Sequence, residues 1–293
     1  MKKRQKAFDS SSAPHPSSLR SSLRPKKSLG QNFLVDERVV DRIIRAVDPR
    51  GDEVIIEIGP GRGALTSRLI ERAGRVVAIE FDRHLAQLLG DRFKSIESFS
   101  VVEGDALQID LCAAAAAPAT SKARVVANLP YYISTAILQR LIEQRRCLSE
   151  MTLMLQREVV ERITAPPGAG ERGFLSVLVE AYCEAQALFD VSPAAFHPMP
   201  KIWSTVVRLR TRRHVATDVK DEALLWRVVS AGFAQRRKTI LNNLRAAHDD
   251  LRTLIEIKGG AARLLEAAQI EPQRRAETLK LDEWGRVARL LEG

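Results

Sequence analysis

The sequence predicts a doubly wound α/β domain followed by a smaller domain made only of helices. Apolar runs typical of buried strands occur seven times, and most are separated by segments with helical spacing. A glycine-rich turn follows the first of these runs, and beyond residue 211 only helical spacing continues. We therefore expect an α/β domain at residues 25–211 and a helical domain at residues 212–293. Residues 1–24, which are rich in serine and basic side chains, are expected to form a disordered basic tail.

The elements can be assigned in order along the chain. Asp36 is a suitable N-cap for a first helix, whose apolar positions between Val39 and Val47 fall at helical spacing. Residues 112–122 are expected to form a surface loop and residues 211–219 a linker. The expected strands are 54–58, 75–79, 99–102, 125–127, 151–155, 187–191 and 205–210, the last of which closes the sheet. The other expected helices are 64–72, 133–142, 158–163, 174–187, 224–233, 240–247, 261–268 and 281–291.

The composition narrows the classes of function. A net charge of +10, from 46 basic and 36 acidic residues, is compatible with a polyanionic partner and equally with a basic soluble surface. No apolar run is long enough to span a bilayer, so no membrane contact is expected. Cys112, Cys147 and Cys183 lack CxxC spacing, which predicts neither a disulfide nor a zinc site and favours a reducing, cytoplasmic compartment. The histidines are scattered, so no metal centre is expected.

The glycine-rich turn begins a candidate cofactor site. Gly59 and Gly61 would let a ligand approach the backbone. With Ala64 they also fit the relaxed GxGxxA pattern of NAD-binding proteins. A third interpretation is a turn with a purely structural role. Glu80 ends the second strand and can accept hydrogen bonds from ribose hydroxyls. Asp105, after the third strand, suits the exocyclic amine of a cofactor adenine, or simply caps a helix. Two acids at successive strand ends favour S-adenosylmethionine over NAD.

A second site motif follows the fourth strand. Asn128, Leu129, Pro130 and Tyr131 come at its carboxyl end, where open α/β sheets bind ligands. A carboxamide beside an aromatic ring can hold a planar nucleobase by its exocyclic amine. We read this segment as the catalytic part of an adenine-N6 methyltransferase. A stiff loop containing two prolines is expected to present Phe196 and the histidine after it.

The helical domain contains a short basic segment, Arg236, Arg237 and Lys238. Charge runs are usually solvated helix faces. With an RNA substrate already indicated, phosphate contact becomes the favoured reading, and Asn242 and Asn243 could add polar contacts.

Eight motifs occur in one order: KKSLGQNFL, EIGPGRGALT, AIE, EGDA, NLPYYIS, QREVVERI, FHPMP and QRRKTILNNL. Together they resemble the ribosomal RNA adenine N6,N6-dimethyltransferases, from about residue 25 to the C-terminus. The resemblance implies transfer of two methyl groups to each of two adjacent adenosines, in the hairpin near the 3′ end of small-subunit ribosomal RNA. It also implies a Rossmann-like methyltransferase domain with a small helical C-terminal domain. The implied partner is this RNA or an immature small subunit, bound by a monomer.

The resemblance also implies roles for individual residues. The Asn128 side chain and the Leu129 carbonyl would hold the target N6, while Tyr131 stacks on the flipped base and Phe196 covers its other face. The chain departs from the family at Ile202-Trp203, where a valine and a small polar residue are more usual before the serine. S-adenosylmethionine would lie against Asn32, Leu34, Gly59, Glu80, Asp105 and Asn128.

Three alternatives stay open from sequence. A large-subunit RNA methyltransferase of the macrolide-resistance type shares the N-x-P-[YF] segment, although Leu129, Tyr131 and the QRRKTILNNL segment favour the small-subunit family. Relatives on this fold that act in transcription or ribosome assembly make a non-catalytic role the second alternative. An NAD-dependent oxidoreductase is the third, and it leaves residues 128–131 unexplained.

Overall fold

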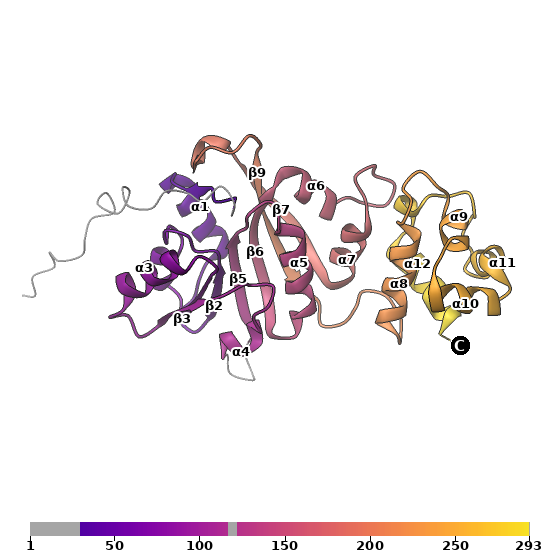
Figure 1. Cartoon of the computed structure of the whole chain (residues 1–293), viewed down its shortest axis with the longest axis horizontal. Coiled ribbons are helices and arrows are strands. Elements are labelled where there is room, and N and C mark those ends of the chain that lie inside the picture. The colour runs from indigo at the N-terminus through magenta and orange to yellow at the C-terminus, as the bar shows by residue number, and fades with distance from the viewer. Residues whose placement is uncertain (1–29, 117–121, 293) are drawn as a thin grey trace, which may run out of the picture.

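The computed structural model describes residues 30–116 and 122–292, so the predicted tail and part of the predicted loop 112–122 lie outside the described residues. Within these ranges a seven-stranded sheet forms the centre of the molecule (Figure 1), as the sequence predicts. Its order is β4-β3-β2-β5-β6-β9-β7, with β9 antiparallel to both of its neighbours and the first five strands parallel. The strands are β2 (Val54–Ile58), β3 (Arg75–Glu80), β4 (Phe99–Glu103), β5 (Ala123–Asn128), β6 (Leu148–Gln156), β7 (Cys183–Val191) and β9 (Ser204–Thr211).

The strand order reverses direction between β2 and β5. From β2 the chain builds outward through β3 and β4, then returns to place β5 on the other side of β2. In open α/β sheets, the crevice at such a reversal, outside the carboxyl ends of the strands, is where ligands bind. The topology therefore locates a binding site before any side chain is considered.

Helices cover both faces of the sheet because its strand residues alternate between two cores. Ile55 and Val126 belong to a core shared with the first helix, whereas Ile56 and Val125 belong to the core on the other face. The first helix is capped as predicted, since Asp36 accepts a hydrogen bond of 2.9 Å from the Arg38 N–H. The covering helices are α1 (Glu37–Val47), α2 (Thr66–Ile70), α3 (Arg83–Phe93), α4 (Leu111–Ala115), α5 (Ser134–Glu143), α6 (Arg157–Ile163) and α7 (Phe174–Tyr182), with short 3₁₀ turns η3 (Arg145–Cys147) and η4 (Pro193–Ala195).

A separate two-stranded ribbon joins two distant parts of the chain. β1 (Phe33–Leu34) pairs antiparallel with β8 (Phe196–His197), and Leu34 lies opposite Phe196. This pairing draws the segment before α1 against the loop that follows β7, at the site edge of the sheet.

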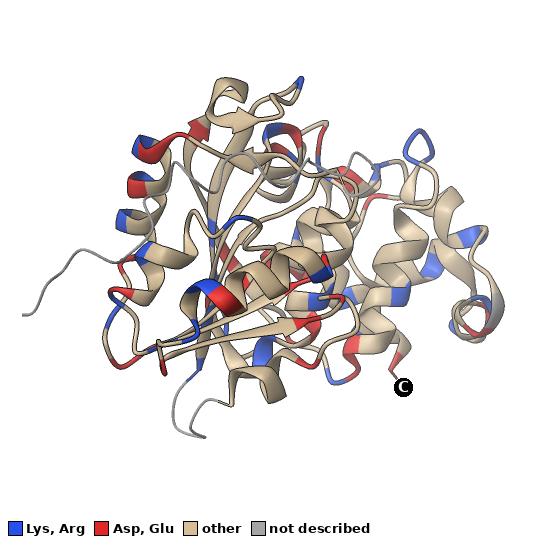
Figure 2. Ribbon diagram, turned by 60° about the vertical axis from the view of Figure 1, so that its left-hand side comes forward, with Lys and Arg blue, Asp and Glu red and all other residues tan. Residues whose placement is uncertain are grey.

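After β9 the described chain contains only helices, and these pack together at one end of the molecule (Figure 1). Their core centres on Trp284, which is fully buried and whose ring lies against Gly232. The elements are α8 (Glu222–Gly232), α9 (Ile240–Arg245), α10 (Asp249–Ile257), α11 (Gly260–Ala267), η5 (Ala276–Thr278) and α12 (Leu281–Leu291), of which α10 was not expected from the sequence. Basic and acidic residues are interleaved over the sheet and its helices (Figure 2).

Several expectations about the elements were wrong. The helix predicted over 174–187 ends at Tyr182, because residues from Cys183 onward pair with β9 despite their helical propensity. β9 does not close the sheet at its edge but lies between β6 and β7. Residues 111–115 form helix α4, with Asp110 as N-cap, where a loop was expected.

The cysteine prediction was also wrong. Cys112 and Cys147 form a disulfide between α4 and η3, and only Cys183 of the three is free. The absence of CxxC spacing therefore did not exclude a disulfide between cysteines brought together by the fold. The expectation of a reducing compartment loses the support that it drew from these cysteines.

Candidate active site

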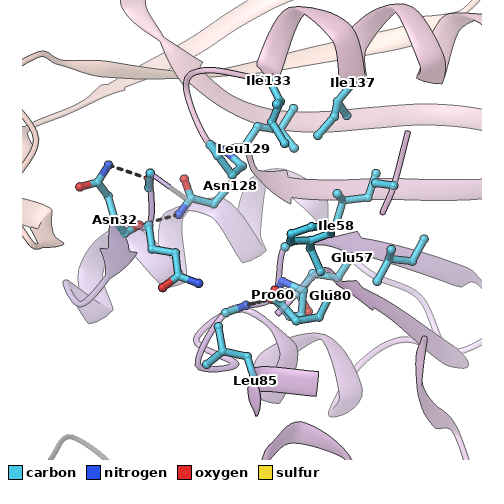
Figure 3. A pocket seen from close by; sticks show the side chains of 18 of the residues that line it. Asn32, Glu57, Ile58, Pro60, Glu80, Leu85, Asn128, Leu129, Ile133 and Ile137 are labelled. Carbon is cyan, nitrogen blue, oxygen red and sulfur yellow. Dashed lines mark hydrogen bonds between the residues drawn. The ribbon is translucent and has the colours of Figure 1, made fainter. Parts of the chain in front are cut away.

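A cavity of about 270 Å³ lies at the carboxyl ends of β2, β3, β4 and β5, where the topology predicts a site (Figure 3). The ribbon of β1 and β8 forms part of its wall through Phe33, Leu34 and Phe196. All the residues expected to bind cofactor or base line this one cavity: Asn32, Leu34, Gly59, Gly61, Glu80, Asp105, Asn128, Leu129, Pro130, Tyr131 and Phe196.

The glycine turn and the acid after β3 are bonded to each other. The Gly61 N–H donates to one oxygen of Glu80 over 3.0 Å, and the Asp82 N–H donates to the other over 2.9 Å. Gly61 has a positive φ of 58°, and a Cβ there would press on the Phe33 ring at 3.1 Å. Burial raises the pKa of Glu80, and the hydrogen bonds from Asp82 and Gly61 oppose that rise. The turn thus holds a buried carboxyl in a set orientation at the cavity.

A second buried acid, Glu57, was not predicted to belong to the site. It lies on β2, lines the cavity, and accepts a hydrogen bond of 2.6 Å from the Thr66 hydroxyl. Burial raises the pKa of Glu57 to about 8, with a smaller contribution from the neighbouring charge of Glu80. The available signal was an acid inside an otherwise apolar strand, since such an acid is rarely buried without a reason.

At the end of β4, Asp105 lies at the cavity and also closes a turn. It lines the cavity, and one carboxylate oxygen accepts a 2.9 Å hydrogen bond from the Leu107 N–H, as in a capping turn. Phe81, directly after Glu80, lines the same part of the cavity and is 60% exposed. This aromatic side chain was missed by the sequence reasoning. An exposed ring at a cavity wall can stack on a planar ligand.

Asn128 ends β5 with a defined orientation. Its side-chain nitrogen donates to the Asn32 carbonyl over 3.3 Å, and Asn32 in turn donates to the Gly30 carbonyl over 3.3 Å (Figure 3). Because the nitrogen of the carboxamide is held by this carbonyl, its oxygen is left as the acceptor that the side chain can offer to a ligand. The wall segment at 30–34 therefore sets the direction of the Asn128 amide.

The aromatic residues of the two motifs lie around the same space. The Tyr131 hydroxyl is 2.9 Å from the Ser204 hydroxyl, and burial raises the pKa of Tyr131, so the phenol stays protonated at neutral pH. Phe196 is only 4% exposed and lines the cavity, whereas the neighbouring His197 is exposed. The Pro130 carbonyl accepts a hydrogen bond of 3.3 Å from the Ile133 N–H, which closes a turn after Asn128.

The basic segment lies outside this cavity, between α8 and α9. Arg236, Arg237 and Lys238 are all exposed, and the Arg236 guanidinium donates to the Gly170 carbonyl. Asn243, considered as a polar contact, is instead buried, and its side-chain nitrogen donates to the Gly232 and Gln235 carbonyls at 2.5 and 3.2 Å. Its role is to hold the turn that carries the basic segment.

Across residues 30–116 and 122–292, no three His, Cys, Asp or Glu side chains gather as a metal site would require. Among the helices of the same ranges, none is long and apolar enough to cross a bilayer.

A family model described as ribosomal RNA adenine dimethylase matches residues 22–285. The chain belongs to the ribosomal RNA adenine dimethylase family. This confirms the resemblance drawn from the eight motifs and excludes the NAD-dependent oxidoreductase.

Known members of the family are similar over most of their length. Proteins named ribosomal RNA small subunit methyltransferase A from Hahella chejuensis and Geobacillus thermodenitrificans are each 41% identical to the chain. The first alignment covers 90% of this chain and 91% of the relative, and the second covers 91% and 90%.

Solved structures support the fold of the family. A dimethyladenosine transferase from Plasmodium falciparum has a TM-score of 0.71 at 23% identity, covering 87% of this chain and 95% of that one. The 23S rRNA methyltransferase ErmE has a TM-score of 0.64 at 24% identity, covering 89% and 100%. Because a methyltransferase named for 23S rRNA also has this fold, the fold alone does not identify the RNA that a protein methylates.

Proposed function

We propose that this dimethylase uses S-adenosylmethionine to dimethylate N6 of two adjacent adenosines in the 3′-terminal hairpin of small-subunit ribosomal RNA. The observation that carries the proposal is the Asn128 carboxamide, whose nitrogen is held by the Asn32 carbonyl so that its oxygen is available to an amine. The relatives at 41% identity, which are named for the small subunit, support this choice of RNA.

The polar groups of the cavity fit S-adenosylmethionine. Glu80 offers a fixed carboxylate to ribose hydroxyls, Asp105 offers its second carboxylate oxygen to an adenine amine, and Gly59 and Gly61 leave backbone space beside them. Phe81 adds an aromatic face for the adenine. Asn32 and Leu34 would complete the site from the β1 side. When bound, this cofactor supplies a methyl group on a cationic sulfur, which is open to attack by a nitrogen lone pair.

The residues around Asn128 would bind the target base. The Asn128 oxygen and the Leu129 carbonyl can each accept one N6 hydrogen, which draws the nitrogen out of conjugation and aims its lone pair. Tyr131 and Phe196 would lie on the two faces of the ring, and Pro130 sets the turn between them. Stacking contributes about 1–3 kcal/mol per base, which offsets the few kcal/mol that base flipping costs. Catalysis is then mainly positioning, with no strong base, because the amine loses its proton after it becomes cationic.

The chain would bind RNA through two domains, residues 25–211 and 212–293. Arg237 and Lys238 are exposed and suited to phosphate contact, while Arg236 would add to this surface beside its bond to Gly170. We further propose that the protein acts as a monomer on immature small subunits in the cytoplasm.

The test is methyl transfer by Asn128→Ala. We expect at least a roughly 100-fold loss of rate on small-subunit RNA, in line with removal of one oriented hydrogen-bonding group from an active site. Cofactor affinity, measured separately by calorimetry, and thermal unfolding should show that the fold is intact. Gln186→Ala, which removes an exposed amide on the edge strand β7, is the matched control and should behave as wild type.

Mass spectrometry of the RNA decides between the candidate functions. Dimethyladenosine in small-subunit RNA supports the proposal, whereas methylation of large-subunit RNA would favour the macrolide-resistance type. A protein that binds ribosomal subunits but transfers no methyl group would be a non-catalytic factor. A near-normal rate of methyl transfer by Asn128→Ala would contradict the proposed mechanism even if the RNA target were correct.

A further inference from the structure

The loop between β8 and β9 carries apolar side chains that point to solvent. Met199 is 68% exposed, Ile202 40% and Trp203 45%. Isolated exposed apolar residues are ordinary, but three in one short loop are not. Lys201, between them in sequence, is also exposed. The loop therefore joins an apolar surface to a positive charge.

The two ends of this loop lie at the proposed base pocket. Phe196, before the loop, lines the cavity. Ser204, immediately after Trp203, is hydrogen bonded to the Tyr131 hydroxyl at 2.9 Å. Consecutive Cα atoms are about 3.8 Å apart, so the Cα atom of Trp203 lies that far from the Cα atom of Ser204, whose hydroxyl contacts Tyr131. The two ends of the loop are thus anchored at the proposed site, through Phe196 and Ser204.

Trp203 contacts Arg157 through its backbone carbonyl and through its ring. The Arg157 N–H donates to the Trp203 carbonyl over 3.0 Å, and its guanidinium lies 4.9 Å from the centre of an indole ring. Asp190 holds the same guanidinium at 2.6 Å and accepts a second hydrogen bond of 2.6 Å from Thr205. An aromatic ring that already packs against an oriented cation loses little further conformational entropy when a ligand stacks on it.

We propose that Trp203, supported by Arg157, is a stacking platform for the nucleobase next to the target adenosine. The inference rests on the proposed function, because a base that leaves its stack exposes the face of its neighbour. An indole face offers a sequence-tolerant replacement for the lost stacking, and Lys201 places positive charge near the RNA backbone.

The experiment uses a hairpin RNA with two adjacent adenosines and the full-length protein. We compare Trp203→Ala, Trp203→Phe and Trp203→Leu, with Ile257→Ala as control because Ile257 is an exposed apolar residue on α10, at 72%. Trp203→Ala should weaken RNA binding and raise KM by about 5- to 150-fold, the range expected for one base–aromatic stack, with a smaller effect on kcat. Phenylalanine should restore most of this loss and leucine should not, because only phenylalanine has a π face.

A fluorescent base separates this inference from the proposed function. 2-Aminopurine at the target position should change its fluorescence on binding to the same extent with wild type and with Trp203→Ala, since the target leaves its stack in both. Placed at the adjacent position, it should be quenched by wild type and not by Trp203→Ala. Failure of the first signal counts against the base-flipping function itself. Two results would overturn the platform alone. One is a normal signal at the target position together with unchanged quenching at the adjacent position in Trp203→Ala. The other is full activity of Trp203→Leu, which would indicate an aliphatic contact or a protein partner at this loop.

Discussion

The buried acid Glu57 makes stability depend on pH in a direction that can be worked out from the structure. Its pKa is about 8 in the folded protein against 4.5 for an ordinary glutamate, because burial removes the carboxyl from water. Between these two values the folded state keeps a proton that the unfolded state has released. The contribution of Glu57 to stability therefore falls as pH rises from about 4.5 to about 8. Each pH unit is worth about 1.4 kcal/mol, so a difference of about 3.5 units sets a limit of about 5 kcal/mol.

Glu57→Gln tests this reasoning. Glutamine cannot ionise, and its side-chain oxygen can still accept the hydrogen bond from Thr66. We expect the variant to gain at least ~2 kcal/mol relative to wild type between pH 5 and pH 8, since relaxation and water entry reduce the limit. The free energy of unfolding is measured by urea titration at pH 5, 6.5 and 8.

The control is Glu97→Gln, which removes an exposed acid after α3. It should leave the pH dependence of unfolding parallel to that of wild type. If Glu57→Gln also runs parallel to wild type, Glu57 is ionised in the folded protein and the assignment of a neutral buried acid is wrong.

Two other substitutions probe the site and the helical end of the molecule. Tyr131→Phe keeps the ring and loses the bond to Ser204, so we expect methyl transfer to fall only about 2- to 10-fold in single-turnover assays; a loss as large as that of Tyr131→Ala would mean that the hydroxyl takes part in the reaction. Gly232→Ala would push a methyl group into the buried Trp284 ring, which should cost about 2 kcal/mol net of the gain in helix propensity and lower the melting temperature. Gly51→Ala, where nothing lies within 4 Å, is the control, and equal melting temperatures for the two variants would contradict the packing argument.

The parts of the site that could be predicted from sequence carry their signals locally. Each of the predicted residues ends a strand or follows one within three residues, and parallel strands end at one edge of the sheet: Gly59, Gly61, Glu80, Asp105 and Asn128. Recognising the strands was therefore enough to bring these residues together. The seven-stranded architecture followed from the same periodicity.

The missed features depend on contacts between distant segments. Nothing near Cys183 shows that its strand will pair with β9, and the residues after it favour a helix when considered alone. Asn243 looks like a surface amide until the carbonyls of Gly232 and Gln235 surround it. The disulfide of Cys112 and Cys147 likewise joins residues 35 positions apart that only the fold places together.

The same distinction applies to the group on which the proposed chemistry depends. That Asn128 ends a strand is a local property, but the direction of its carboxamide is set by the Asn32 carbonyl, 96 positions earlier. Asn32 is held there because Phe33 and Leu34 pair with His197 and Phe196, the latter at the cavity. The pairing of β1 with β8 therefore orients the amide and builds the wall beside it in one step. An acceptor fixed in this way before substrate arrives needs little reorganisation during the reaction, which is the condition under which a single neutral amide can contribute strongly to catalysis.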